Sequence, residues 1–63
     1  MILENTIKQA SQILKQKNIT THELDSEIIL SNILGVTREY LILNNKMHLP
    51  KKIINKYEKA INR

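Results

Sequence analysis

Cysteine, tryptophan and phenylalanine are absent from this chain, and glycine and proline occur once each. Without cysteine there is no disulfide framework and no thiolate chemistry, which fits a reducing compartment such as the cytoplasm. A single glycine excludes the GxGxxG loop and the P-loop, because both need several glycines to bring the backbone close to a phosphate. The core must be aliphatic, and isoleucine alone occurs eleven times among the 63 residues.

Long apolar runs are also missing. None approaches the roughly 20 residues that a membrane-spanning helix needs. The first residues, MILENTIKQ, lack the basic and apolar regions of a signal peptide. We therefore expect a cytoplasmic protein without membrane contact. Residues 1–63 are expected to form one domain, near the size at which a single core is only marginally sufficient.

The stretch from Leu24 to Gly35 has apolar side chains on several sides of a helix. At about 100° per residue they form three groups around the axis: Leu24 with Ile28, Ile29 with Ile33, and Leu30 with Leu34. A helix that is apolar on several sides is normally surrounded by others. Gly35 supplies the positive φ that ends helices, and Val36 is placed to fold back onto Leu30. This pattern predicts the central helix of a small bundle.

The first predicted helix has a single apolar face. Its apolar residues recur at helical spacing: Leu3, Ile7, Ala10 and Leu14. The helix begins at Leu3 or Ile7 and runs to Lys17. The later start is considered because Thr6 with Gln9 offers a capping box, which would leave the first five residues as a lead-in.

The turn into the central helix carries signals of its own. Asn18 tolerates the left-handed conformation that ends a helix, and Ile19 then enters the core. Two starts remain open for the central helix: Thr20 with Glu23 as a capping box, or Thr21 as the N-cap.

A short third helix is predicted after Gly35. Thr37 caps a helix over Arg38–Leu43, whose Leu41, Ile42 and Leu43 are too apolar to be exposed together. Asn44 and Asn45 stop this helix.

The last helix follows a loop that contributes Met47 and Leu49 to the core. Pro50 suits the start of a helix running to Asn62, because the missing N–H of proline costs nothing in the first turn. No strand-period alternation occurs. The predicted fold is therefore all-α, a small bundle of four to five short helices.

The residues offer no group for catalysis or metal binding. His22 and His48 stand far apart, with no HExxH motif and no cysteine partner, so a zinc site is not expected. Asp25 and Glu27 lie about 200° apart on one helix and cannot both face one substrate. We predict no catalytic, cofactor-binding or metal-binding residue, and the segment by itself is not expected to be an enzyme.

The net charge of +4 falls entirely on the last helix. Residues 1–50 carry five basic and five acidic side chains, whereas residues 51–63 carry five basic and one acidic. Four basic residues share the face opposite Ile53, Tyr57 and Ile61, and they are the candidate partner-contact residues: Lys52, Lys56, Lys59 and Arg63. A solvated face is the plain interpretation. The functional one is an electrostatic contact with an acidic partner or nucleic acid.

A helix-turn-helix is a weaker interpretation of the middle of the chain. Ser31, Gly35 and Leu41 fit the spacing of its turn loosely. The helix that would enter the DNA groove carries one basic residue, Arg38, and mostly core material, whereas base recognition needs several exposed polar side chains. Sequence-specific DNA binding is therefore not expected.

The order and spacing of these pieces resemble the amino-terminal domain of the bacterial release-factor glutamine methyltransferases (the HemK/PrmC family). The resembling pieces cover nearly the whole chain: Thr6–Lys17, Asn18-Ile19, Asp25–Leu30, Leu34-Gly35, Thr37–Leu43, Leu49-Pro50 and Ile61–Arg63. The chain departs from the family pattern at Asn18, where Gly is usual, at Ser26, where Ala is usual, and at His22, where Pro is frequent. None of these changes threatens the fold.

The resemblance implies a parent enzyme that uses S-adenosylmethionine to methylate the glutamine of the Gly-Gly-Gln motif in peptide-chain release factors. In that family the small helical domain helps to hold the protein substrate, while a second domain does the chemistry. The cofactor loop and the Asn-Pro-Pro-Tyr active-site motif are absent here, so no catalytic residue carries over. We expect the catalytic domain to follow Arg63. The alternative is a free-standing helical interaction or nucleic-acid-binding module, and the reading frame beyond Arg63 would distinguish the two.

Overall fold

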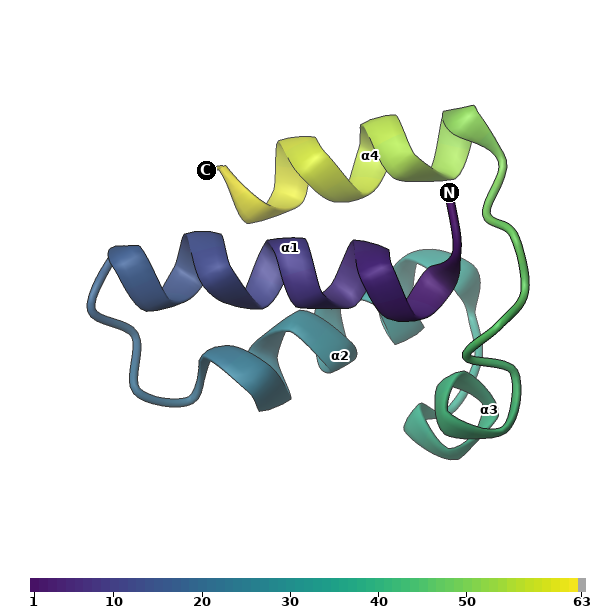
Figure 1. Ribbon diagram of the computed structural model, residues 1–63, viewed down its shortest axis with the longest axis horizontal. Helices are drawn as coiled ribbons and strands as arrows, with labels where there is room; N and C mark the ends of the chain where they lie inside the picture. Colours follow the sequence, from purple (N-terminus) through teal and green to yellow (C-terminus); the bar gives the residue numbers. More distant parts are fainter. Residues whose placement is uncertain (63) are drawn as a thin grey trace.

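The computed structural model describes residues 1–62, which form an all-α bundle as predicted (Figure 1). Four helices lie within that range: α1 (Leu3–Gln16), α2 (His22–Leu34), α3 (Arg38–Leu43) and α4 (Lys51–Ile61). An isolated β-bridge between Ile2 and His48 ties the start of the chain to the loop before α4. In the same part of the chain, no helix is both long and apolar enough to cross a membrane.

Helix α1 begins at Leu3, and the capping box predicted at Thr6 is wrong. Thr6 is buried inside the helix, where its hydroxyl donates to the carbonyl of Ile2 at 3.1 Å. The first amides of α1 are satisfied by the backbone of the loop after α3, since Leu3 donates to Met47 at 2.8 Å and Glu4 to Asn45 at 2.9 Å. Backbone carbonyls of a loop about forty residues away in the sequence therefore cap α1, and no local side chain does.

The turn between α1 and α2 follows the sequence prediction in part. Asn18 has a φ of 64°, so the left-handed end of α1 is confirmed. Helix α2 begins at His22, which makes Thr21 rather than Thr20 the N-cap residue. The Thr21 side chain caps no amide but donates to the carboxylate of Asp25 at 3.1 Å.

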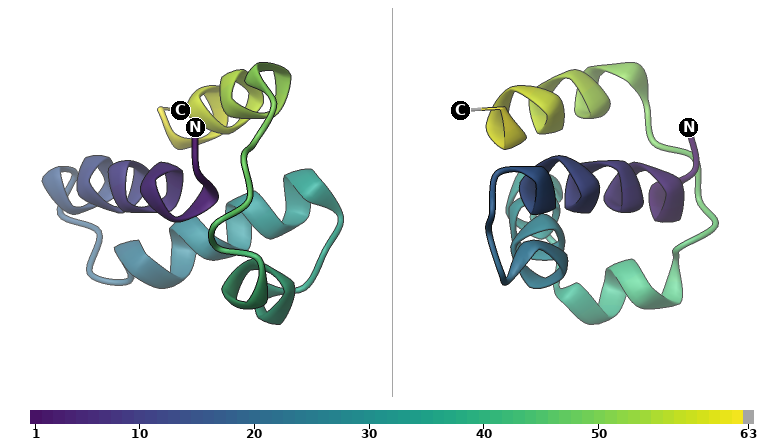
Figure 2. Two further views of the ribbon diagram at one scale, coloured as in Figure 1. Left: turned by 45° about the vertical axis from the view of Figure 1, so that its right-hand side comes forward. Right: turned by 60° about the vertical axis from the view of Figure 1, so that its left-hand side comes forward.

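Helix α2 contacts all three other helices, and its central position is confirmed (Figure 2). Leu30 is fully buried, and Ile29 and Ile33 are half-buried against the core. Leu24 and Ile28 nevertheless remain 40% and 38% exposed. The three neighbouring helices thus leave one side of α2 uncovered, and the expectation of burial all round was wrong there.

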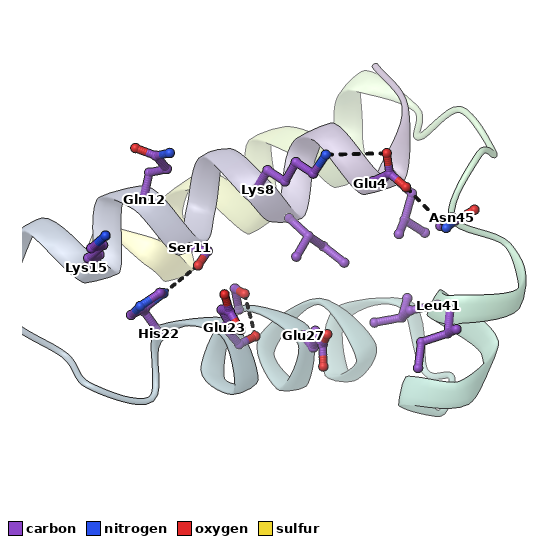
Figure 3. A pocket seen from close by; sticks show the side chains of 14 residues that line it. Glu4, Lys8, Ser11, Gln12, Lys15, His22, Glu23, Glu27, Leu41 and Asn45 are labelled. Atoms are coloured by element: carbon purple, nitrogen blue, oxygen red, sulfur yellow. Dashed lines mark hydrogen bonds and ion pairs between the residues drawn. The ribbon is translucent and has the colours of Figure 1, made fainter.

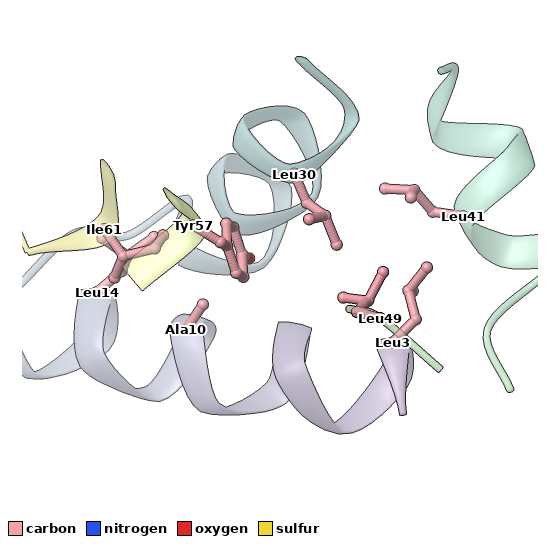
Figure 4. Close-up of a cluster of buried hydrophobic side chains, with 8 residues drawn as sticks. All are labelled: Leu3, Ala10, Leu14, Leu30, Leu41, Leu49, Tyr57 and Ile61. Carbon is pink, nitrogen blue, oxygen red and sulfur yellow. The ribbon is translucent and has the colours of Figure 1, made fainter. Parts of the chain in front are cut away.

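The core runs along the junction of α1, α2 and α4 and continues to α3 (Figure 4). Its fully buried apolar residues are Leu3, Ala10, Leu14, Leu30, Leu41, Leu49, Tyr57 and Ile61. The Tyr57 hydroxyl donates to the carbonyl of Ser26 at 2.7 Å, which joins α4 to α2 inside the core. Lys17 donates to the last carbonyl of α4, that of Ile61, at 3.1 Å.

The predicted signals around α3 are confirmed, and its apolar run at 41–43 is more exposed than its composition suggested. Gly35 has a φ of 69°, and the Thr37 side chain accepts from the amide of Tyr40 at 3.1 Å. Only Leu41 is buried, whereas Ile42 and Leu43 are 62% and 82% exposed. Successive helical residues lie about 100° apart, so a short helix resting on α2 turns only one of three consecutive side chains inward.

The loop and last helix lie close to the prediction. Leu49 is buried and Met47 is half-buried, so both contribute to the core as expected. Pro50 occupies the N-cap of α4, and its carbonyl accepts from the amides of Ile53 and Ile54.

Candidate docking surfaces

The predicted contact residues on α4 form an exposed basic face. Lys51, Lys52, Lys56 and Lys59, which we call the basic face, are all exposed. Tyr57 and Ile61 are buried on the opposite side of the helix, as the spacing predicted. Of the four residues predicted for this contact, Lys52, Lys56 and Lys59 belong to the basic face, and Arg63 lies outside the described residues.

The basic face keeps its charges available to a partner. Within residues 1–62, none of its lysines forms an ion pair. The buried hydrogen bond of Tyr57 and the contact from Lys17 to Ile61 fix α4 against α2 and α1. Fixed surface charges of one sign attract an oppositely charged partner over a distance of about a Debye length.

A second surface, missed by the sequence analysis, is a groove of about 470 Å³ between α1, α2 and α3 (Figure 3). Leu3, Ile7, Leu41 and Ile42 contribute apolar side chains to it. Lys8, Gln12 and Lys15 line it from α1, and Glu23 and Glu27 line it from α2. We call Lys8 and Lys15 the basic rim, and Glu23 and Glu27 the acidic rim.

Polar contacts hold the helices that border this groove. The Ser11 hydroxyl and the Nδ1 of His22 lie 2.6 Å apart and join α1 to α2. Glu4 accepts from Asn45 and Lys46, each at 3.2 Å, and joins α1 to the loop after α3. The hydrogen bond from Lys46, together with the charges of Lys46 and Lys8, lowers the pKa of Glu4 below its usual value. These contacts fix the spacing of the rims.

The polar residues that the sequence analysis considered for catalysis or metal binding are not gathered at one site. Arg38 binds Glu27 through both Nη2, at 2.7 Å, and Nε, at 3.0 Å, whereas Asp25 accepts from Thr21. His22 is half-buried beside Ser11, and His48 is exposed in the loop before α4. No cluster of three or more metal-ligating side chains is present in the described part of the chain.

Helix α3 exposes apolar side chains beside only two charged ones, Arg38 and Glu39. Its exposed side chains include Tyr40, Ile42 and Leu43, and its arginine is held by Glu27. Base recognition in a DNA groove uses several exposed polar side chains on one helix. The exposed aliphatic side chains of α3 suit contact with protein better.

The family described as the PrmC N-terminal domain matches residues 5–63, which run from the first turn of α1 through α4. The chain belongs to this family. No curated protein and no solved structure gives a significant match. The family links the chain to the amino-terminal part of a release-factor methyltransferase, and the resemblance expected from the sequence is confirmed.

In this PrmC N-terminal domain α4 and α3 lie on different sides of α1 (Figure 2). The basic face of α4 and the groove therefore lie on different sides of the α1–α2 pair. Helix α1 turns Thr6 and Ile13 toward α4, while Ile7, Lys8 and Lys15 line the groove. One partner could therefore contact both surfaces only by reaching around the domain or by offering two segments.

Proposed function

We propose that this chain is the substrate-docking domain of an S-adenosylmethionine-dependent methyltransferase that modifies the glutamine of the Gly-Gly-Gln motif in peptide-chain release factors. The observation that carries the proposal is the match to the PrmC N-terminal domain over residues 5–63. In this proposal the enzyme is cytoplasmic, and the cofactor and the catalytic residues belong to a domain that follows Arg63.

The basic face of α4 supports a docking role. Its lysines have no ion-pair partner in residues 1–62, and they share one side of a helix whose other side is packed into the core. Charges arranged in this way accelerate the encounter with an acidic surface and contribute less to the final affinity. We propose that Lys52, Lys56, Lys59 and Arg63 guide the release factor toward the enzyme.

The test compares association rates. Lys56→Glu with Lys59→Glu should slow association of the enzyme with its release factor and flatten the salt dependence of that rate. Lys56→Arg with Lys59→Arg is the matched control, because it keeps both charges and should keep the rate. Equal rates and equal salt slopes for the charge-reversed and wild-type proteins would show that the basic face is only solvated.

The cofactor assignment has its own measurement. Titration of this chain with S-adenosylmethionine should give no saturable heat, because one glycine cannot build the cofactor loop. Saturation at micromolar ligand would place a cofactor site within these residues and would contradict the docking-domain proposal.

The basic face also supports a second candidate, a free-standing module that binds nucleic acid. Such a module would bind duplex DNA with a strong dependence on salt. Tight binding to DNA at moderate salt, together with no binding to a release factor, would favour this candidate. A reading frame that continues past Arg63 into a glycine-rich methyltransferase loop would favour the first.

A further inference from the structure

The groove is the largely uncovered side of the α1–α2 pair. Helix α4 packs along the other side, while α3 closes only one end of the groove (Figure 3). Ile42 lines that end with 62% of its surface exposed, and Leu43 beside it is 82% exposed. Exposed aliphatic side chains that adjoin a groove are typical of a surface that contacts another molecule.

The charges of the groove are separated by helix. Lys8 and Lys15 lie two turns apart on α1, about 10 Å along the helix, and form the basic rim. Glu23 and Glu27 lie one turn apart on α2 and form the acidic rim. Neither Lys15 nor Glu23 has an ion-pair partner within residues 1–62. The groove thus has one unpaired charge of each sign on opposite sides of a floor that is apolar toward α3 and carries Ser11 and His22 at its other end.

This pattern selects among classes of ligand. A nucleic acid would bring its phosphates against Glu23 and Glu27, and like charges would repel it. A small molecule could fill the groove but would leave Leu43 exposed beside it. An amphipathic helix satisfies all three features: its apolar side chains cover the floor and the exposed end of α3, and its two polar edges meet the two rims.

We propose that the groove between α1, α2 and α3 binds an amphipathic helix of the release factor, with acidic side chains facing the basic rim and basic side chains facing the acidic rim. This inference rests on the proposed function, because it takes the helix from the enzyme's substrate. A helix with the opposite arrangement would place like charges together on both edges, so the groove also selects the direction of binding.

The first test uses nuclear magnetic resonance of the isotope-labelled chain titrated with a full-length release factor. Amide shifts should change at Ile7, Glu23 and Ile42. Ile42→Ser should raise the Kd about 5- to 30-fold, because its exposed side chain becomes buried on binding. Leu24→Ser is the matched control, since Leu24 is an exposed leucine on α2 that does not line the groove. It should change the Kd less than twofold.

The second test exchanges one charge between the two rims at constant net charge. Lys15→Glu with Glu23→Lys exchanges one charge across the groove and should raise the Kd about tenfold, because each edge of the bound helix then meets one like charge. Lys15 and Glu23 are both exposed on their helices. Circular dichroism of the variant checks that the helical fold is kept.

The outcomes separate this inference from the proposed function. If the release factor does not bind, both fail. If it binds wild type, Ile42→Ser and the exchanged rims equally well, the groove inference is overturned and the docking function stands. Concentration-dependent shifts at the groove without a release factor would assign the groove to a second copy of the chain and would also overturn the inference.

Discussion

Tyr57 joins α4 to α2 through one buried hydrogen bond. Its ring is 1% exposed, and its hydroxyl donates to the carbonyl of Ser26, a residue that is itself fully buried. Burial, together with the nearby charge of Glu27, raises the pKa of Tyr57 well above its usual value of 10.0. The hydroxyl is therefore held in its neutral form.

This buried hydroxyl predicts a loss of stability in alkali. Above pH 10 the unfolded chain releases the Tyr57 proton while the folded chain keeps it, so the free energy of unfolding falls as pH rises, with a slope of at most about 1.4 kcal/mol per pH unit. Urea titrations across this range measure the slope. Tyr57→Phe should cost about 1 kcal/mol at pH 7 and should remove most of the alkaline slope. An unchanged slope in the variant would assign the alkaline loss to other groups.

Gly35 and Asn18 are the two residues with positive φ in the described part of the chain. A Cβ added at Gly35 would meet nothing within 4 Å, so any penalty there comes from the backbone conformation. Gly35→Ala should therefore destabilise the domain by about 1 kcal/mol, as measured by urea unfolding. Asn55→Ala, at an exposed position within α4, is the control and should cost nothing because alanine favours helix. A stabilised Gly35→Ala protein would contradict this account of the helix end.

At the scale of helices, the helix ends that depend on nearby residues were predicted correctly. Features that depend on contacts between residues far apart in the sequence were not. Asn18, Gly35 and Thr37 act within a few residues of their own position, so the sequence was sufficient to place all three. The start of α1 depends on Met47 and Asn45, about forty residues away, and no local pattern contains that contact. The exposure of Ile42 was also missed, because burial depends on how α3 rests on α2.

The sequence pattern also does not show which apolar side chain of α2 contributes most to the free energy of unfolding. In the structure Leu30 is fully buried, whereas Ile29 and Ile33 are half-buried. Leu30→Ala should reduce the free energy of unfolding by about 2–5 kcal/mol, a large share of the stability of so small a domain. Ile28→Ala on the same helix should cost less than half as much, because Ile28 is 38% exposed. Equal losses in the two variants would show that α2 is packed differently.

At the scale of the whole molecule, only one of the two candidate surfaces was visible in the sequence. The basic face of α4 is a run of lysines on one helix, which composition and spacing reveal directly. The groove combines Lys15 of α1, Glu23 of α2 and Ile42 of α3. Each of these residues has an ordinary local context, and they form a surface only after the three helices have packed.

The two surfaces should affect different steps of binding to a release factor. In the proposed docking, charges on the basic face act before contact, so Lys56→Glu with Lys59→Glu should lower the association rate and leave dissociation nearly unchanged. Ile42 acts only after contact, so Ile42→Ser should raise the dissociation rate instead. Stopped-flow kinetics at low and moderate salt measures both rates.

Combining these substitutions tests whether one release factor contacts both surfaces. The surfaces lie on different sides of the α1–α2 pair and share no side chain, so the changes in binding free energy should add within about 0.5 kcal/mol. The combined protein should then show both the slower association and the faster dissociation. If the substitutions on one surface have no effect once the other surface has been changed, the release factor uses a single continuous surface, and the arrangement of two separate contacts is wrong.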